Sequence, residues 1–413
     1  MSGEVTVTGF GVRTAFGAGA EALRRGVFGG IPSFAATTRF DTAPYRTPMA
    51  GVAPDGPDAV EDWALRHALA RCGAEARDMA GLRPGAEAAV LLGAAGDSTS
   101  VTRYWRATDR HGEGRHGEDR HGEDRHGGDR HREGQGAGRV ADAVPARLAE
   151  LFAARLGLTG PRLTFTNACV ASAAAIIHAC RLISSGRTEV AVCAGGYLVE
   201  EETFGKFDSG RALSRDGMVR PFSADRSGLL LGDGVAAVVL ESAGHARRRG
   251  ARPLATVVGW GAATDAYHVS QPHPEGVGLA AAARQALRLA GDPEGAALGY
   301  VNAHGTGTKY NDGAETRGLR SVLGGRADAV PVSSTKSTTG HLLEAAGVVE
   351  FVITLLSLTD GVLPPTAGYT RPDPECDLDY VPNRPRRVDA RRALTLNAAF
   401  GGANTALVLE RPR

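Results

Sequence analysis

The sequence predicts an α/β protein built from two related halves. Apolar, β-branched segments alternate with helical segments along the 413 residues, a pattern typical of sheets covered by helices on both faces. A succession of strand, polar turn and apolar helix occurs in each half, at residues 163–181 and 330–358. This internal similarity indicates that one architecture is repeated, with the halves meeting near residue 255.

The other elements of the two halves correspond in the same order. Each half is expected to have a helical stretch, an apolar strand after it, and a strand that closes the half. These pairs are residues 63–72 and 279–290, residues 88–93 and 298–303, and residues 234–241 and 403–410. The N-terminal residues 1–9 alternate like a strand, so a further strand is expected there.

Composition argues against several classes of protein. A hydrophobic content of 42% is normal for a globular protein with a large core, and a formal net charge of +1 disfavours nucleic acid or membrane surfaces as partners. The N-terminus lacks the features of a secretion signal, so a cytoplasmic protein is expected. The five cysteines have no metal-ligand spacing and are expected to be reduced thiols.

A charged repeat interrupts the first half at about residues 109–139. Units such as Arg115-His116-Gly117-Glu118-Asp119 recur there with almost no apolar residues, which predicts a disordered surface insertion. The alternative is metal binding by histidines of the repeat. These are His111, His116, His121, His126 and His131.

The first candidate site is a cysteine at the junction of a strand and a helix. Leu163-Thr164-Phe165 reads as the strand, and Ala171 to Arg181 reads as the helix. Cys169 lies between them, where the free N–H groups of a helix N-terminus favour a thiolate. A buried, inert cysteine is the alternative.

Three further polar, glycine-rich segments follow expected strands. They are residues 301–308 with His304, residues 334–341 with Lys336 and His341, and residues 397–402 with Phe400. Imidazoles, an ammonium group and backbone N–H groups are the partners that a thiol needs to attack a thioester and to stabilise a carbanion. Lysine occurs in the chain only at Lys206, Lys309 and Lys336, so a lysine in such a loop invites a specific role.

Together these segments resemble the β-ketoacyl synthase family of condensing enzymes, in its elongating class with one cysteine and two histidines. Further blocks are similar to the family in the same order: Arg211-Ala212-Leu213-Ser214, Arg220-Pro221-Phe222, Asp225-Arg226, Gly232-Asp233-Gly234 and Asp265-Ala266-Tyr267-His268. The resemblance extends from Val7 to Glu410, the repeat insertion excepted.

The resemblance implies the thiolase-like fold, in which two duplicated βαβαβαββ halves form a five-layered α/β/α/β/α core. Residues 1–255 would carry the cysteine, and residues 256–413 the histidines and the lysine. The implied reaction is decarboxylative Claisen condensation of a cysteine-bound acyl chain with malonyl on acyl carrier protein. No metal, nucleotide or redox cofactor is implied. The implied partners are acyl carrier protein and a second subunit, either a copy of the chain or a homologue resembling a chain-length factor.

The resemblance also assigns the nucleophile and the oxyanion hole. Cys169 would be the nucleophile, its thiolate favoured by the helix terminus and a nearby imidazole. Backbone N–H groups of Cys169 and Phe400 would bind the oxyanion, and Gly401 and Gly402 would let the backbone approach the substrate. Phe400 would also gate the acyl pocket.

The remaining roles concern the malonyl unit and its carrier arm. His304 and His341 would donate hydrogen bonds to the malonyl carbonyl as neutral imidazoles. Lys336 would orient one of them and pair with Glu315 of the block Asn311-Asp312-x-x-Glu315; a purely structural ion pair is the alternative.

Three hydroxyl side chains occupy positions that contact phosphopantetheine in members of the family. They are Thr306, Thr308 and Ser270. The alternative for hydroxyls in such glycine-rich loops is that they cap turns.

Two departures from the family pattern concern the pocket. Ala399 stands in a gate loop that is often richer in glycine, so a stiffer loop is expected. Glu344 follows His341 by one helical turn, where a small residue is common, and its carboxylate is expected to face the imidazole or a partner subunit.

We expect an active synthase of polyketide or specialised fatty-acid biosynthesis. Two other functions are weighed: a non-catalytic subunit resembling a chain-length factor, and an acyltransferase of the same fold that does not decarboxylate. The retained cysteine argues against the first, and the paired histidines argue against the second because simple acyl transfer needs one base.

Overall fold

The computed structural model describes residues 3–54, 64–99, 101–102 and 140–412. The predicted insertion at about residues 109–139 lies outside the described residues. All five cysteines are buried and free, which confirms the expectation of reduced thiols. Within the described ranges, no helix has both the length and the apolar character needed to cross a membrane.

Two sets of strands with the same order form the sheets. The first set, in spatial order, is β6 (Arg162–Phe165), β5 (Ala89–Gly93), β7 (Val190–Tyr197), β8 (Gly234–Ser242) and β1 (Val5–Thr14). The second set is β11 (Val332–Ser333), β10 (Leu298–Asn302), β14 (Arg392–Ala398), β15 (Ala403–Glu410) and β9 (Ala255–Thr264). In both sets the third strand along the chain lies at the outer edge, followed by the second, fourth, fifth and first. Pairing of β1 with β9 joins the two sets.

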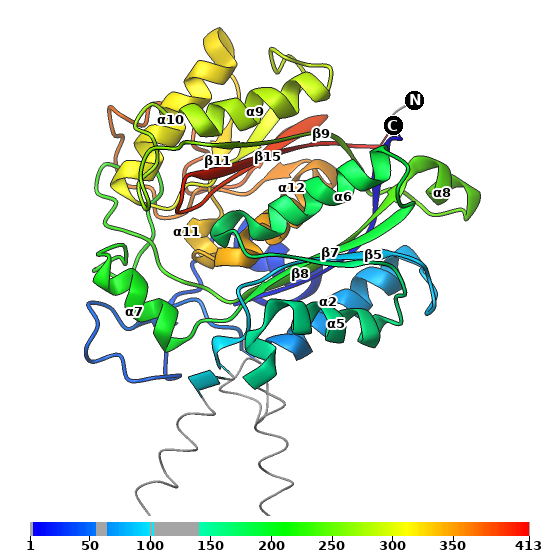
Figure 1. Cartoon of the computed structure of the whole chain (residues 1–413). Helices are drawn as coiled ribbons and strands as arrows, with labels where there is room; N and C mark the ends of the chain where they lie inside the picture. Colours follow the sequence, from blue (N-terminus) through cyan, green and yellow to red (C-terminus); the bar gives the residue numbers. More distant parts are fainter. Residues whose placement is uncertain (1–2, 55–63, 100, 103–139, 413) are drawn as a thin grey trace, which may run out of the picture.

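Helices cover both faces of each set and give five layers (Figure 1). Helices α2 (Leu65–Ala80) and α5 (Pro145–Leu156) lie outside the first set, and α9 (Val277–Leu289) and α10 (Lys309–Leu323) lie outside the second. Helices α6 (Ala171–Ser184) and α12 (Ala346–Asp360) fill the middle layer. Residues 346–358 of α12 are buried on every side, as expected for an apolar helix between two sheets. The thiolase-like fold is therefore confirmed.

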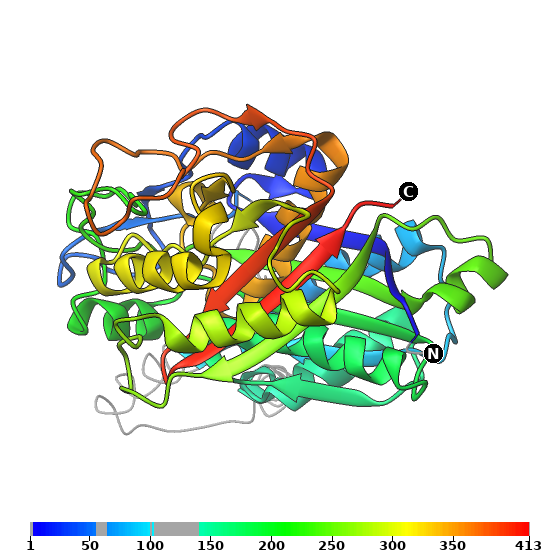
Figure 2. The same cartoon turned by 90° about the horizontal axis from the view of Figure 1, so that it is seen from above.

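Glycines in the first strand of each set let an outer helix pack directly on the backbone. A Cβ atom at Gly11 of β1 would lie 2.1 Å from the carbonyl oxygen of Cys72 in α2. A Cβ atom at Gly261 of β9 would lie 2.0 Å from the carbonyl oxygen of Ala282 in α9, which runs along β9 and β15 (Figure 2). The two halves thus share the close packing of an outer helix on glycines of the first strand, as well as the strand order.

The structure contains the predicted helices and strands, with small shifts at their ends. The helix predicted at 63–72 extends to Ala80, and the apolar helix predicted within 330–358 is Ala346–Asp360, after a 3₁₀ turn. The shorter elements are β2 (Gly17–Ala18), α1 (Gly19–Leu23), η1 (Arg24–Phe28), β3 (Ala35–Ala36), β4 (Met49–Ala50), η3 (Ala141–Ala143), η4 (Ala168–Val170), α7 (Glu201–Ser209), α8 (Ala243–Arg248), η5 (Gly324–Arg326), α11 (Lys336–Thr339), η6 (Leu343–Ala345), β12 (Val362–Leu363) and β13 (Arg386–Arg387).

Candidate active site

Cys169 lies in a sharp turn between β6 and α6. Ala168 has φ +52°, a left-handed conformation that non-glycine residues rarely adopt, and it opens the 3₁₀ turn η4. The helix α6 begins two residues after Cys169, whose side chain is only 6% exposed. The turn therefore places the thiol, buried, at the junction of strand and helix, as predicted.

The second half contains the same turn with a different residue at its tip. Leu343 has φ +44° and opens the 3₁₀ turn η6, which leads into α12. The residue that corresponds to Cys169 is thus Glu344. Unlike the first half, the second half has a further segment between the end of β11 at Ser333 and this turn.

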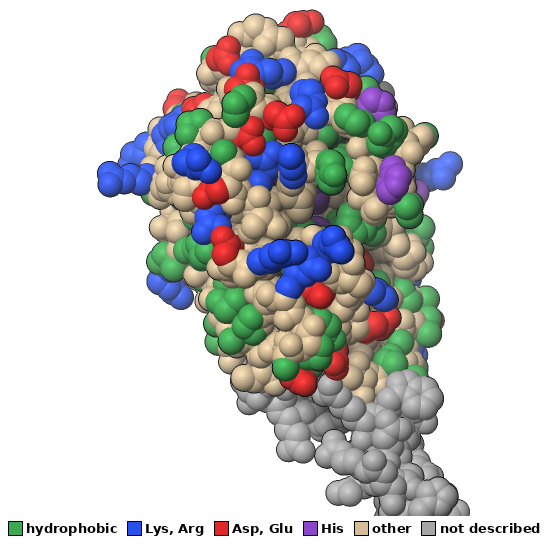
Figure 3. Space-filling model, turned by 90° about the vertical axis from the view of Figure 1, so that its left-hand side faces the viewer, with side chains coloured by type: hydrophobic (Ala, Val, Ile, Leu, Met, Phe, Trp, Pro, Cys, Tyr) green, Lys and Arg blue, Asp and Glu red, His purple; other side chains and the backbone are tan. Residues whose placement is uncertain are grey.

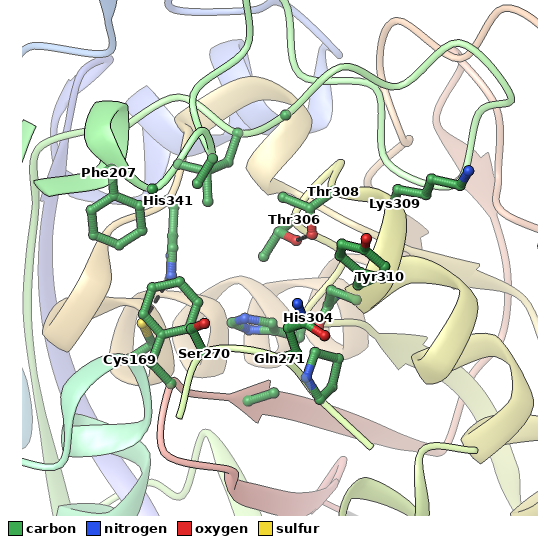
Figure 4. A pocket seen from close by; sticks show the side chains of 18 of the residues that line it. Cys169, Phe207, Ser270, Gln271, His304, Thr306, Thr308, Lys309, Tyr310 and His341 are labelled. Atoms are coloured by element: carbon green, nitrogen blue, oxygen red, sulfur yellow. Dashed lines mark hydrogen bonds between the residues drawn. The ribbon is translucent and has the colours of Figure 1, made fainter. Parts of the chain in front are cut away.

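His341 lies in that further segment and faces the thiol. Its Nε2 atom is 3.0 Å from Cys169 Sγ (Figure 4). The backbone N–H of His341 donates to the carbonyl oxygen of Leu230 at 2.7 Å, which holds the residue against the chain before β8. The ring is therefore placed to exchange a proton with the sulfur.

His304 follows β10 and lies beside His341. Its ring centroid lies 5.4 Å from that of His341, and the two rings are nearly perpendicular, at 85°. Glu315 of α10 holds the loop, because its two carboxylate oxygens accept the backbone N–H groups of His304 and Gly305, each at 2.7 Å. Asp312 accepts the N–H of Thr306 at 3.1 Å in the same way.

Lys336 is buried, and its partner is not the predicted one. Its ammonium group donates to Glu350 of α12, whose other carboxylate oxygen accepts the side-chain amide of Asn397 at 2.6 Å. Glu315 instead binds the backbone beside His304, so the predicted Lys336–Glu315 pair is wrong. The sequence did hold a signal for Glu350, which is a charged residue within the apolar run of α12.

Burial decides the protonation states of the site. Desolvation, followed by the negative charge of Glu344, raises the pKa of the Cys169 thiol to about 12, although Lys336 opposes this rise. The resting group is therefore a thiol, in contrast to the thiolate expected from the helix terminus. Desolvation and then Lys336 lower the pKa of both His304 and His341 well below its usual range. Both rings are neutral at neutral pH, as expected.

A cavity of about 420 Å³ contains the cysteine and both histidines in its wall. Thr306, Thr308 and Ser270 line it as well (Figure 4). The hydroxyls of the two threonines bond to each other at 2.7 Å, and the backbone N–H of Ser270 donates to His268 Nδ1 at 3.0 Å.

The outer part of this cavity carries positive charge. The exposed side chains of Lys206, Arg211 and Lys309 contribute to its lining. Figure 3 shows the hollow on this face, with lysine and arginine side chains near its edge. All lysines of the chain thus lie at or directly behind this cavity.

Phe400 lines the cavity and is 51% exposed. Its ring stacks on that of Phe207 in α7, with centroids 5.6 Å apart. Gly401 and Gly402 have φ values of +84° and +80°, so this turn requires glycine for its backbone conformation. This backbone requirement adds to the predicted role of the two glycines, which is close approach of the backbone to the substrate.

Glu344 does not make the predicted contact with His341. Leu343 in its left-handed conformation breaks the helical spacing that would place residues 341 and 344 on one face. The carboxylate instead lines a second cavity beside Cys169. Among the described residues, no group of histidine, cysteine, aspartate or glutamate side chains could hold a metal ion.

Comparisons with known proteins agree with this geometry. The sequence models of the N-terminal and C-terminal domains of β-ketoacyl synthases match residues 62–246 and 254–370. A tetracenomycin polyketide synthase ketoacyl synthase alpha subunit from Streptomyces glaucescens is 36% identical over 99% of this chain and 97% of its own. The 3-oxoacyl-(acyl-carrier-protein) synthase 2 of Vibrio harveyi is 41% identical over 65% of this chain and 67% of its own. The solved ishigamide ketosynthase/chain length factor has a TM-score of 0.87 and 30% identity, with 100% of both chains covered. The chain belongs to the β-ketoacyl synthase family.

Proposed function

We propose that the protein is a β-ketoacyl synthase that condenses an acyl chain on Cys169 with a malonyl unit on acyl carrier protein, releasing carbon dioxide. The observation that carries this proposal is the convergence of Cys169, His341 and His304 in the wall of one cavity. A thiol, a base in contact with it and a second neutral imidazole are the groups that this reaction needs.

The first step transfers the acyl chain to the cysteine. His341 Nε2 accepts the thiol proton as Cys169 Sγ attacks the carbonyl carbon of the acyl thioester. The oxyanion forms beside the backbone N–H groups of Cys169 and Phe400. Its collapse breaks the bond to the pantetheine sulfur, which takes the proton from His341 and leaves.

The second step forms the new carbon–carbon bond. Malonyl thioester loses carbon dioxide, and the electron pair of the broken bond becomes an enolate, whose oxygen is stabilised by N–H groups of His304 and His341. A neutral imidazole has one N–H, so His341 presents its other tautomer in this step. The enolate carbon then attacks the acyl carbonyl, and the bond to Cys169 breaks with release of the thiolate, which takes up one proton from water to return the thiol.

The surrounding residues position these groups. Lys336 supplies positive potential to both histidines, which is supported by its lowering of the pKa of each ring. The pantetheine arm runs past Thr306, Thr308 and Ser270, a path supported by their place in the cavity lining. Asp312 and Glu315 hold the loop of His304 through backbone N–H groups.

Two partners follow from this function. The carrier is an acidic protein that delivers its arm past the positive side chains Lys206, Arg211 and Lys309. The second subunit is either another copy of the chain or a homologue; ketosynthases from the ishigamide system and from Xenorhabdus doucetiae are described with a chain length factor. The pathway makes polyketides or specialised fatty acids. No cofactor beyond the carrier arm is proposed, and a cytoplasmic location and a division near residue 255 stay predictions.

Incubation with acyl and malonyl carrier proteins tests the proposal. We expect a β-ketoacyl product and carbon dioxide. The Cys169→Gln variant should lose condensation and retain malonyl decarboxylation, because the histidines remain. Cys180→Ala, a change at a buried cysteine of α6, should retain both activities and serves as the matched control.

The two other functions predict different products. Acyl transfer to an amine or alcohol without carbon dioxide release would identify an acyltransferase. Absence of both acylation and condensation, in a folded protein that supports the activity of a second synthase subunit, would identify a non-catalytic partner. Either result would overturn the proposal.

A further inference from the structure

A second cavity, of about 360 Å³, lies beside Cys169. Cys169, Phe207 and Phe400 line both cavities, so the stacked phenylalanine rings lie between the two spaces. An acyl group on the sulfur must leave the first cavity free for the malonyl arm. The second cavity is therefore the space available to the acyl chain.

The lining of this second cavity is unusually polar for a hydrocarbon chain. Two of its carboxylates are already bound: Asp97 accepts the backbone N–H of Leu65 at 2.8 Å, and Glu200 caps α7 by accepting N–H groups of that helix. These hydrogen bonds hold the wall of the cavity in place and occupy carboxylate oxygens that could otherwise bind a ligand.

Two other polar groups of the lining have no side-chain partner among the described residues. Tyr197 is only 7% exposed, and its hydroxyl makes no hydrogen bond with any residue that the structure describes. Glu344, at the tip of η6, forms no hydrogen bond with another residue's side chain within the described part of the chain. Cys169, Tyr197 and Glu344 all line this one cavity. A buried hydroxyl without a partner is costly unless a ligand completes its hydrogen bonding.

We propose that Tyr197 and Glu344 select acyl chains that carry oxygen, binding keto or hydroxyl groups of the chain while its carbonyl end is attached to Cys169. A keto oxygen can accept from the Tyr197 hydroxyl, and a chain hydroxyl can donate to the Glu344 carboxylate. A saturated hydrocarbon chain of the same length leaves both groups unpaired, so the enzyme discriminates against it. This inference rests on the proposed function, since it presumes that Cys169 is acylated.

The test is the rate at which pantetheine thioesters of equal chain length acylate Cys169, followed by intact-protein mass. The probes are octanoyl, 5-oxooctanoyl and 7-oxooctanoyl pantetheine. We expect at least one oxo chain to load about tenfold faster than octanoyl, as judged by kcat/KM. Tyr197→Phe should reduce this preference about three- to tenfold, and Glu344→Leu should speed octanoyl loading.

A matched variant separates selection from general damage. Tyr300→Phe removes the hydroxyl of another buried tyrosine. That hydroxyl forms a hydrogen bond of 2.8 Å with Ser333 Oγ, and Tyr300 does not line this cavity. The variant should leave the preference unchanged, and thermal melting should show that all variants fold. Equal loading of octanoyl and both oxo chains, or an unaltered preference in Tyr197→Phe, would overturn the inference while leaving the proposed function intact. If none of the chains acylates Cys169, both proposals fail.

Discussion

The turns at Cys169 and at Glu344 have the same backbone and different chemistry. Each begins with a residue at positive φ, continues as a 3₁₀ turn and leads into a helix of the middle layer. The two turns also contact each other. At the tip, one carries a thiol and the other a carboxyl group. The comparison shows that the repeated fold supplies a position, while the residue at that position decides the chemistry.

The segments before the two turns explain how the halves divide the work. In the first half β6 ends at Phe165, and the turn starts at Ala168. In the second half β11 ends at Ser333, and the turn starts only at Leu343. The longer segment carries Lys336 and His341. In the proposed mechanism, one half therefore contributes the nucleophile, and the other contributes the base and the positive charge around it.

The largest expected effect concerns the buried ion pair of the longer segment. Lys336→Met should lower the free energy of unfolding by about 3 to 5 kcal/mol, because Glu350 is left without its cation in the interior. Urea unfolding measures this loss. Lys206→Met removes an exposed lysine paired with Glu202 and should cost less than about 1 kcal/mol.

A double variant separates structure from chemistry at the same pair. Lys336→Met combined with Glu350→Leu should recover much of the lost stability, since no unpaired charge remains. Decarboxylation of malonyl carrier protein should stay impaired, because the potential at both histidines is gone. Full recovery of the rate would mean that the pair is only structural.

The next effect concerns the loop that carries His304. Glu315→Ala should lower the free energy of unfolding by about 2 to 4 kcal/mol, because two buried N–H groups lose their acceptor. Malonyl decarboxylation should fall with it, since His304 loses its position. Glu275→Ala, at an exposed glutamate, is the control and should change neither quantity. An active, fully stable Glu315→Ala protein would show that the loop is held by other contacts.

The pKa and the alkylation rate of Cys169 should depend on Glu344 in the opposite turn. With the pKa of Cys169 raised to about 12, its alkylation by iodoacetamide should speed up about tenfold per pH unit between pH 7 and 10, without a plateau. Glu344→Gln removes a negative charge that disfavours the thiolate, so the pKa should fall and alkylation should be faster at each pH. A plateau near pH 7 in the wild-type protein would indicate a thiolate at rest.

The smallest effect concerns backbone strain at the first turn. Ala168→Gly should raise the free energy of unfolding by about 1 kcal/mol, because glycine adopts positive φ without a steric cost. Ala173→Gly, inside α6, should lower it by about the same amount. Thermal melting compares the two variants. The same sign for both would mean that the conformation of Ala168 carries no strain.

The sequence predicted the class of fold and the cysteine and histidines that converge in one cavity, because both leave local patterns. Alternating strands and helices are visible in the order of apolar residues, and Cys169 and His341 lie in polar segments next to such strands. The partner of Lys336 was not predicted, because Glu350 meets it only through the packing of α12. The position of Glu344 was not predicted either, because regular helical spacing from His341 was assumed. Leu343 adopts a left-handed conformation, and no glycine or asparagine at that position signals it in the sequence.

The most direct test of the convergence at Cys169 is peptide mass spectrometry after the protein is mixed with an acyl carrier thioester. We expect the acyl group on the peptide that contains Cys169, and no acylation of a Cys169→Ala protein that still decarboxylates malonyl carrier protein. Acylation at another cysteine, or the same mass gain in the variant, would contradict the assignment of the nucleophile.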